Sequence, residues 1–101
     1  MGNALAYNAS KAAIIQMTKY QAVHYAKWNI RVNCISPGTF PPPGTFSNGK
    51  EWFESELKEM NPLQKLGEPW HLKGSIALLA STLGDYITGQ NIAVDGGWTT
   101  W

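Results

Sequence analysis

A long stretch without glycine or proline, residues 7–27, is the feature that most restricts how this chain folds. Apolar residues recur in it at helical spacing and cover more than one stripe, which predicts a helix that packs on two sides. Residues 30–35 follow directly and are rich in β-branched side chains, which predicts a strand. Ser36, Pro37 and Gly38 are expected to end that strand.

The rest of the chain alternates between loops and short elements. Residues 39–49 hold three consecutive prolines and read as a stiff loop. Asn48 and Glu51 have the spacing of a capping box, which predicts a short helix to Met60. Glu54 and Lys58 stand four residues apart on it and are expected to pair. Pro69 marks the first turn of a third helix that runs to about Leu83. A second short strand is expected at residues 91–94 and a turn at residues 95–97.

The order helix, strand, helix, helix, strand predicts an α/β fold with parallel strands. The 101 residues fit one domain. Two strands are too few to form such a sheet alone. The order of elements therefore indicates that a partner half of the sheet is absent.

Composition excludes several classes of function. A net charge of +1 with scattered lysines gives no basic stripe for nucleic acid or anionic lipid. No apolar run approaches the roughly 20 residues of a membrane span. Cys34 is the only cysteine, so no disulfide can form within the chain, and a reduced cytoplasm is expected.

Tyr7 and Lys11 stand four residues apart and therefore leave the same face of the predicted helix. A free phenol ionises near pH 10 and is a poor acid–base group at neutral pH. An ammonium about 4 Å away favours the phenolate by roughly 4 kcal/mol at an effective dielectric of 20. The spacing alone is weak evidence, because a tyrosine in the first turn of a helix is more often a packing residue.

Four sequence blocks, in the same order, resemble the short-chain dehydrogenase/reductase family. Residues 7–13 (Tyr-Asn-Ala-Ser-Lys-Ala-Ala), with their YxxxK spacing, resemble its active-site helix. Residues 33–38 (Asn-Cys-Ile-Ser-Pro-Gly) are similar to its cofactor turn, and residues 67–69 (Gly-Glu-Pro) to the start of a later helix. Residues 86–98 resemble its C-terminal strand and turn. Together the blocks cover nearly the whole chain.

The resemblance implies a Rossmann-like doubly wound fold that binds NAD or NADP at the carboxyl ends of its strands. By this analogy Tyr7 exchanges a proton with a carbonyl or alcohol substrate, and Lys11 tunes Tyr7 and holds the nicotinamide ribose. Pro37, Gly38 and the backbone near Phe40 would lie against the nicotinamide. The family also implies a homo-oligomer, a dimer or tetramer, because its long helix and C-terminal segment commonly form subunit contacts.

The chain departs from the family pattern in two places. Pro42 stands where members often place a threonine, so Thr39 or Thr45 is expected to substitute for its contact to the nicotinamide. The family's glycine-rich phosphate loop and its catalytic serine and asparagine precede the tyrosine, which is residue 7 here. We therefore expect the chain to be the C-terminal portion of such a doubly wound sheet, which lacks the dinucleotide-binding half and is inactive alone. A non-catalytic oligomerisation module derived from such an enzyme is the alternative.

The remaining candidates are aromatic residues and histidines. Residues 39–60 are expected to form a lid, hereafter the lid segment, as the family's variable segment does. Four aromatic side chains either line a substrate pocket beneath it or pack in a core or interface: Phe40, Phe46, Trp52 and Phe53. Trp98 and Trp101 are expected at an interface or pocket edge. His24 and His71 have no companion at metal-ligand spacing, so no metal site is expected.

Overall fold

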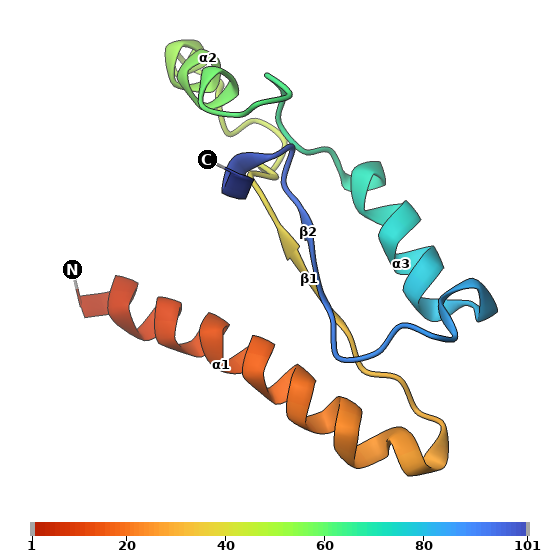
Figure 1. Cartoon of the computed structure of the whole chain (residues 1–101). Helices are drawn as coiled ribbons and strands as arrows, with labels where there is room; N and C mark the ends of the chain where they lie inside the picture. The colour runs from red at the N-terminus through yellow and green to blue at the C-terminus, as the bar shows by residue number, and fades with distance from the viewer. Residues whose placement is uncertain (1, 101) are drawn as a thin grey trace. The chain divides into compact units, whose positions relative to one another are not determined.

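The computed structural model of the chain describes residues 2–100. Its helices and strands are α1 (Gly2–Tyr25), β1 (Cys34–Pro37), α2 (Glu51–Glu59), α3 (Lys73–Ala80) and β2 (Asn91–Val94) (Figure 1). Short 3-10 turns lie at Ala26–Trp28, Pro69–Leu72, Thr82–Gly84 and Trp98–Thr100. Helices joined to a pair of strands confirm the α/β class. Trp101 lies outside the described residues.

The two strands pair with each other and run side by side (Figure 1). The Cys34 N–H donates to the Gln90 carbonyl over 2.9 Å, and the Gly38 N–H donates to the Val94 carbonyl over 3.0 Å. From the first of these hydrogen bonds to the second, the residue number rises by four on both strands. The strands are therefore parallel, as expected.

The chain divides into two units that share these strands. The first unit consists of the residues up to Ile35 together with Ala77–Ile92. The second consists of Ser36–Ile76 together with the residues from Ala93 onward. Each strand therefore begins in the first unit and ends in the second.

In the first unit, α1 buries one face against the loop that leads into β2. Thr18 and Ala22, one helical turn apart, are only 6% and 4% exposed. A Cβ at Gly89 would lie 3.3 Å from the Cβ of Ala22, and Gly89 has a φ of +71°. The Thr18 hydroxyl donates to the Ile14 carbonyl over 2.8 Å, so burial leaves it satisfied. Because Gly89 has no side chain and Ala22 has a small one, the loop before β2 can approach α1 closely at this point.

The side chain of Arg31 bonds three backbone carbonyls near the end of α3. Its guanidinium donates to the carbonyls of Leu79 (2.7 Å), Ser81 (3.1 Å) and Ile87 (3.2 Å). The last carbonyls of a helix have no partner within the helix and attract cations. Arg31 thus caps α3 and joins it to the segment before β2.

Asn33 forms a second bridge to that segment. Its side-chain amide donates to the Ile87 carbonyl over 2.9 Å, and its side-chain oxygen accepts from the Gln90 N–H over 3.0 Å. The Val32 N–H donates to the Thr88 hydroxyl over 3.1 Å. These side-chain contacts fix the register of β1 against β2 before the regular backbone pairing begins.

The prediction of a strand at residues 30–35 is wrong in its bounds, because β1 is Cys34–Pro37. Residues 30–33 make other contacts: the Ile30 N–H donates to the Tyr25 carbonyl over 3.3 Å, and the side chains of Arg31 and Asn33 bond outside a ladder. Pro37 is tolerated inside the strand because Cys34 and Gly38 donate to the β2 segment and Pro37 lies an odd number of residues from each. The missing N–H of Pro37 would point away from β2.

The helix predictions also need correction at their ends. α1 begins at Gly2, ahead of the expected residue 7, and ends at Tyr25 before the 3-10 turn. The capping box is wrong: Lys50 is the N-cap of α2 with no side-chain bond, and Asn48 has a φ of +62°. Pro69 does open a helical segment, but that turn is 3-10 and α3 follows at Lys73–Ala80.

Two local predictions are confirmed. β2 has the expected bounds, Asn91–Val94. Lys58 and Glu54 form an ion pair of 2.6 Å on α2. Among residues 2–100, no helix has both the length and the apolar character needed to cross a bilayer.

We expect Arg31→Ala to lower the free energy of unfolding by about 2–4 kcal/mol, because it removes hydrogen bonds from a charged donor. Urea denaturation of the protein at its natural length measures the change. Lys19→Ala, which removes an exposed cation from α1, is the matched control. Equal midpoints for the two variants would show that the Arg31 contacts do not stabilise the fold.

Candidate active site

Tyr7 and Lys11 meet on the surface of α1. The Lys11 Nζ lies over the Tyr7 ring, 5.4 Å from its centroid. The two side chains therefore leave the same helix face, and the recorded contact is a cation–π contact with the ring. The Tyr7 side chain is 61% exposed. The Ser10 hydroxyl donates to the Tyr7 carbonyl over 2.8 Å. The phenol is thus held beside an ammonium and remains open to a ligand.

The pair lies on the side of α1 that is buried further along the helix. Tyr7 and Thr18 are eleven residues apart, which at about 100° per residue places them within about 20° of each other around the axis. Thr18 is buried against the rest of the first unit. Tyr7 and Lys11 therefore lie on the same side of α1 as Thr18. They are nearer the N-terminal end of the helix, where this side is exposed.

In the second unit, Gly38 follows the end of β1 in close contact with the turn after β2. A Cβ at Gly38 would lie 2.7 Å from the Cα of Asp95. Real Cβ atoms do not approach backbone so closely, so this position requires glycine. Pro37 beside it is exposed. The carboxyl end of β1 thus presents an exposed proline ring on a backbone fixed by the neighbouring strand.

The backbone after Gly38 is held by the segment before α3. The Thr39 carbonyl accepts from the Gly67 N–H over 2.8 Å. The Phe40 ring covers Gly67 so closely that a Cβ there would lie 2.6 Å from it. Both Thr39 and Phe40 line a cavity of about 230 Å³, which Lys65 and His71 also border. The cavity is formed within the second unit.

Pro42 and Thr45 form a local turn at the start of the lid segment. The Thr45 N–H and hydroxyl both bond the Pro42 carbonyl, over 3.2 and 2.6 Å. The hydroxyl hydrogen of Thr45 is therefore used within the turn, as in other threonine turns. The substitution of Thr39 or Thr45 for the usual threonine contact stays a prediction.

Asp95 holds the turn after β2 through its carboxylate. The hydroxyl of Thr99 donates to it over 2.8 Å, and the N–H groups of Gly97 and Thr99 donate over 2.9 and 3.1 Å. The Thr99 hydroxyl, followed by the Gly97 N–H, lowers the pKa of Asp95 below its usual value of 3.8. Asp95 is therefore ionised at neutral pH and closes its own turn.

Three of the aromatic candidates are in ring contact within the lid segment. Phe53 contacts Trp52 and Phe46, with ring centroids 5.7 and 6.1 Å apart. Phe46 also lines a groove of about 610 Å³ together with Trp70 and His71, whereas Trp52 and Phe53 are not among its lining residues. Trp70 was not singled out by the sequence pattern. No periodic or motif signal distinguishes it from a packing residue.

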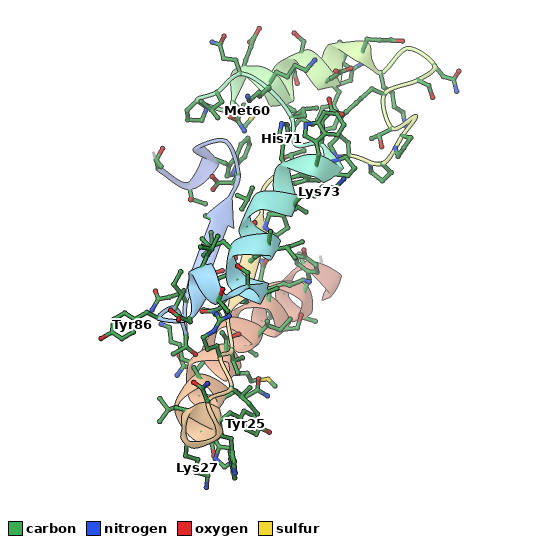
Figure 2. All side chains as sticks on the ribbon, turned by 90° about the vertical axis from the view of Figure 1, so that its right-hand side faces the viewer. Tyr25, Lys27, Met60, His71, Lys73 and Tyr86 are labelled. Carbon is green, nitrogen blue, oxygen red and sulfur yellow. The ribbon has the colours of Figure 1, made fainter. Side chains whose placement is uncertain are left out.

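The two histidines have local partners. His71 lies in the 3-10 turn ahead of α3 (Figure 2). Its Nδ1 accepts from the Glu68 N–H over 2.9 Å. His24 stacks on Tyr20 with centroids 6.0 Å apart. Within residues 2–100, no three His, Cys, Asp or Glu side chains come close enough to hold a metal ion. Trp98 is partly exposed.

The predicted site residues fall in both units. Tyr7 and Lys11 belong to the first unit, and Pro37, Gly38 and Phe40 to the second. The structure brings Tyr7 to Lys11, and it brings Phe40 to Gly67 and Gly38 to Asp95. Sequence reasoning missed Asn61, which is 5% exposed and bonds the Asp95 carbonyl. An asparagine before a proline resembles an ordinary turn, so the sequence carries no signal for this role.

The chain is similar throughout to a known family. The sequence model of the Enoyl-(Acyl carrier protein) reductase family matches residues 1–99. D-arabinitol 2-dehydrogenase of Scheffersomyces stipitis is 41% identical in an alignment 102 positions long, and the alignment covers 94% of this chain. The 7alpha-hydroxysteroid dehydrogenase of Bacteroides fragilis is 42% identical over 97 residues and 96% of the chain.

Solved structures give the same result for the fold. A 4-hydroxyisoleucine dehydrogenase complexed with NADH superposes with a TM-score of 0.86 at 40% identity over 96% of this chain. The match takes in 40% of that protein, and this chain spans 35% of the arabinitol dehydrogenase and 38% of the steroid dehydrogenase. A short chain dehydrogenase from Leptospira borgpetersenii with bound NAD+ superposes with a TM-score of 0.80 at 43% identity. This match covers 92% of the present chain and 35% of the Leptospira chain.

We expect Gly38→Ala to lower the free energy of unfolding by about 1–3 kcal/mol, because its methyl group would overlap the Asp95 backbone. Gly74→Ala is the matched control: nothing lies within 4 Å of its Cβ position, and it lies inside α3. Alanine there should stabilise by up to about 1 kcal/mol. Thermal unfolding of both variants measures the contrast. Equal stability of Gly38→Ala and the unsubstituted protein would contradict the close approach.

Proposed function

Because the chain belongs to the short-chain dehydrogenase/reductase family, we propose that the protein carrying it transfers a hydride between NAD or NADP and a carbonyl or secondary alcohol. The observation that supports this most directly is the contact between Lys11 and Tyr7 on an open helix face. An exposed phenol beside an ammonium is suited to proton exchange with a substrate oxygen.

Tyr7 and Lys11 have distinct roles in this proposal. Tyr7 donates its proton to the substrate oxygen during reduction and accepts one from the alcohol during oxidation. Lys11 places its positive charge beside the Tyr7 ring and donates hydrogen bonds to the ribose hydroxyls. The nicotinamide supplies or accepts the hydride when it is bound.

The residues of the second unit suit the nicotinamide ring of such a cofactor. Pro37 is exposed, and the backbone at Gly38 is fixed against Asp95. Phe40 would bound the same surface with its backbone. The pyrophosphate end of a dinucleotide needs a glycine-rich turn at a helix N-terminus, and no G-x-G-x-x-G sequence occurs in these 101 residues. These residues therefore fit only the nicotinamide and ribose end.

The relatives support the substrate class. D-arabinitol 2-dehydrogenase and galactitol 2-dehydrogenase are named for sugar alcohols, and 7alpha-hydroxysteroid dehydrogenase for a ring alcohol. All three names denote oxidation at a hydroxyl-bearing carbon. A secondary alcohol or the matching ketone is therefore the proposed substrate. Cys34, which forms no disulfide, agrees with the reducing cytoplasm as the compartment.

A second candidate function, a non-catalytic oligomerisation module, is favoured by the other side of α1. Leu5, Tyr20 and Val23 are 77%, 70% and 81% exposed. They lie about 140–200° around the helix from the buried Thr18. A large apolar face of this kind is suited to another protein surface. Within the first proposal, the same face supports assembly as a homo-oligomer.

We expect Tyr7→Phe to reduce kcat by about 10²–10⁴-fold in the protein at its natural length, because phenylalanine has no proton to exchange. Stopped-flow or steady-state NAD(P)H absorbance with ketone substrates measures the rate. Tyr20→Phe, which removes an equally exposed hydroxyl from the same helix, is the control and should leave kcat unchanged. An undiminished rate in Tyr7→Phe would refute the assigned chemistry.

We expect a protein made of residues 1–101 alone to show no NAD(P)H binding in the micromolar range, because it offers no pyrophosphate site. Isothermal titration calorimetry measures this. Sedimentation of the same sample tests the second candidate, which requires a concentration-dependent dimer that is unaffected by Tyr7→Phe. Micromolar binding of NAD(P)H by residues 1–101 would contradict the proposal that these residues hold only the nicotinamide and ribose end of the cofactor.

A further inference from the structure

Asn61 stands where the lid segment ends. It follows the lid helix α2 and is 5% exposed. Its N–H donates to the Lys58 carbonyl over 3.1 Å, and its carbonyl accepts from the Gln64 N–H over 2.7 Å. The backbone of Asn61 thus ends one helix and begins the next turn.

The side chain of Asn61 reaches across to the turn after β2. Its Nδ2 donates to the Asp95 carbonyl over 2.9 Å, and its Oδ1 accepts from the Leu63 N–H over 2.9 Å. The Leu63 N–H also approaches the Gly96 carbonyl at 3.1 Å. Asn61 therefore uses its backbone and side-chain groups together to join residues 34 positions apart in sequence.

The turn after β2 is shaped to receive this side chain. Gly96 has a φ of +65°, and a Cβ there would lie 2.5 Å from the Asn61 Oδ1. Gly97 has a φ of +92°, and a Cβ there would lie 3.0 Å from the Pro62 ring. Two glycines in the left-handed region thus leave room for Asn61 and Pro62 where other residues would clash.

The same turn also holds the start of the lid segment. Gly38, the residue before it, packs so closely on Asp95 that a Cβ would lie 2.7 Å from the Asp95 Cα. Asp95 therefore contacts the chain just before residue 39 and just after residue 60. Between these two points the lid segment also contacts Gly67 through the Thr39 carbonyl and the Phe40 ring, but α2 has no buried residue, so few contacts of its own fix this helix.

We propose that Asn61 is a positioning residue that anchors the C-terminal end of the lid segment to the Asp95–Gly97 turn. The inference rests on the proposed function, in which residues 39–60 cover the substrate. Loss of the anchor weakens substrate binding while Tyr7 and Lys11 remain in place on α1. The side chain must donate and accept at once, which aspartate and leucine cannot do.

The test compares Asn61→Asp with the protein at its natural length. Aspartate keeps the acceptor for the Leu63 N–H but replaces the donor to Asp95 by a second acceptor. We expect KM for the carbonyl substrate to rise about tenfold, with kcat and KM for NAD(P)H changed by less than about threefold. Lys19→Ala, an exposed change on α1 outside the lid segment, is the control and should leave all three constants unchanged. A fall in kcat at constant substrate KM would overturn the proposal.

Hydrogen–deuterium exchange gives a readout that does not need turnover. Amides of residues 50–60 should exchange faster in Asn61→Asp, and amides of α1 should not. If Asn61→Asp does not fold, Asn61→Ser replaces it, because serine can still bond the Leu63 N–H but is too short to reach Asp95. Unchanged exchange in a folded variant would overturn the anchor.

A double-mutant cycle separates the contact from general damage to the turn. A methyl group at residue 96 would occupy the place of the Asn61 Oδ1. Adding Asn61→Ser to Gly96→Ala should therefore raise substrate KM by less than about twofold, although each single change raises it about tenfold. Additive effects would show that the two residues act independently and would contradict the anchor.

The two proposals can fail separately. A natural-length protein without reductase activity would refute the proposed function, and faster lid exchange in Asn61→Asp would still support the anchor. An active protein that Tyr7→Phe disables, but in which Asn61→Asp changes neither substrate KM nor exchange, would refute the anchor alone.

Discussion

The parallel pairing of β1 with β2 is the contact on which both units depend. The Cys34–Gln90 hydrogen bond belongs to the first unit, and the Gly38–Val94 hydrogen bond to the second. A two-stranded pair has little stability in water by itself. Contacts on either side of the strands must therefore hold their register, and in this chain those contacts are largely polar.

Polar side chains that bond backbone groups do this in both units. Arg31 and Asn33 bond the segment before β2, and Asn61 and Asp95 hold the turn after it. Ala22 is the apolar side chain that the structure places in the buried core of the described residues. With little apolar burial, directional hydrogen bonds to partly buried carbonyls specify position, because a carbonyl that loses both water and a partner is costly.

The candidate chemistry lies where the chain leaves surface open. Tyr7 continues the covered side of α1, and Pro37 lies exposed at the end of β1. Groups meant for a ligand must stay accessible, whereas the groups that position them are bonded to backbone. Tyr7 and Asn61 illustrate the two cases: one is an open phenol, and the other uses every polar group it has.

Helical periodicity made the Tyr7–Lys11 contact predictable, because residues four apart share a face whatever surrounds the helix. The same applies to the Glu54–Lys58 pair, and alternation with turn residues located β2 correctly. The start of β1 could not be predicted in this way. β-branched residues favoured an earlier start, but β1 begins at Cys34. Ahead of it, the side chains of Arg31 and Asn33 bond partners some fifty residues away, and the Val32 carbonyl accepts from the Gly89 N–H.

The sequence by itself determined the family, the α/β class, the parallel order and the phenol–ammonium pair, because each follows from local spacing or from blocks of residues in a fixed order. Only the tertiary structure decided where β1 begins, which residues must be glycine at the Asp95 turn, and that Asn61 bonds this turn. Those features depend on atoms that are distant in sequence and meet within 3 Å, such as Asn61 Nδ2 and the Asp95 carbonyl. No local pattern encodes a contact of that kind.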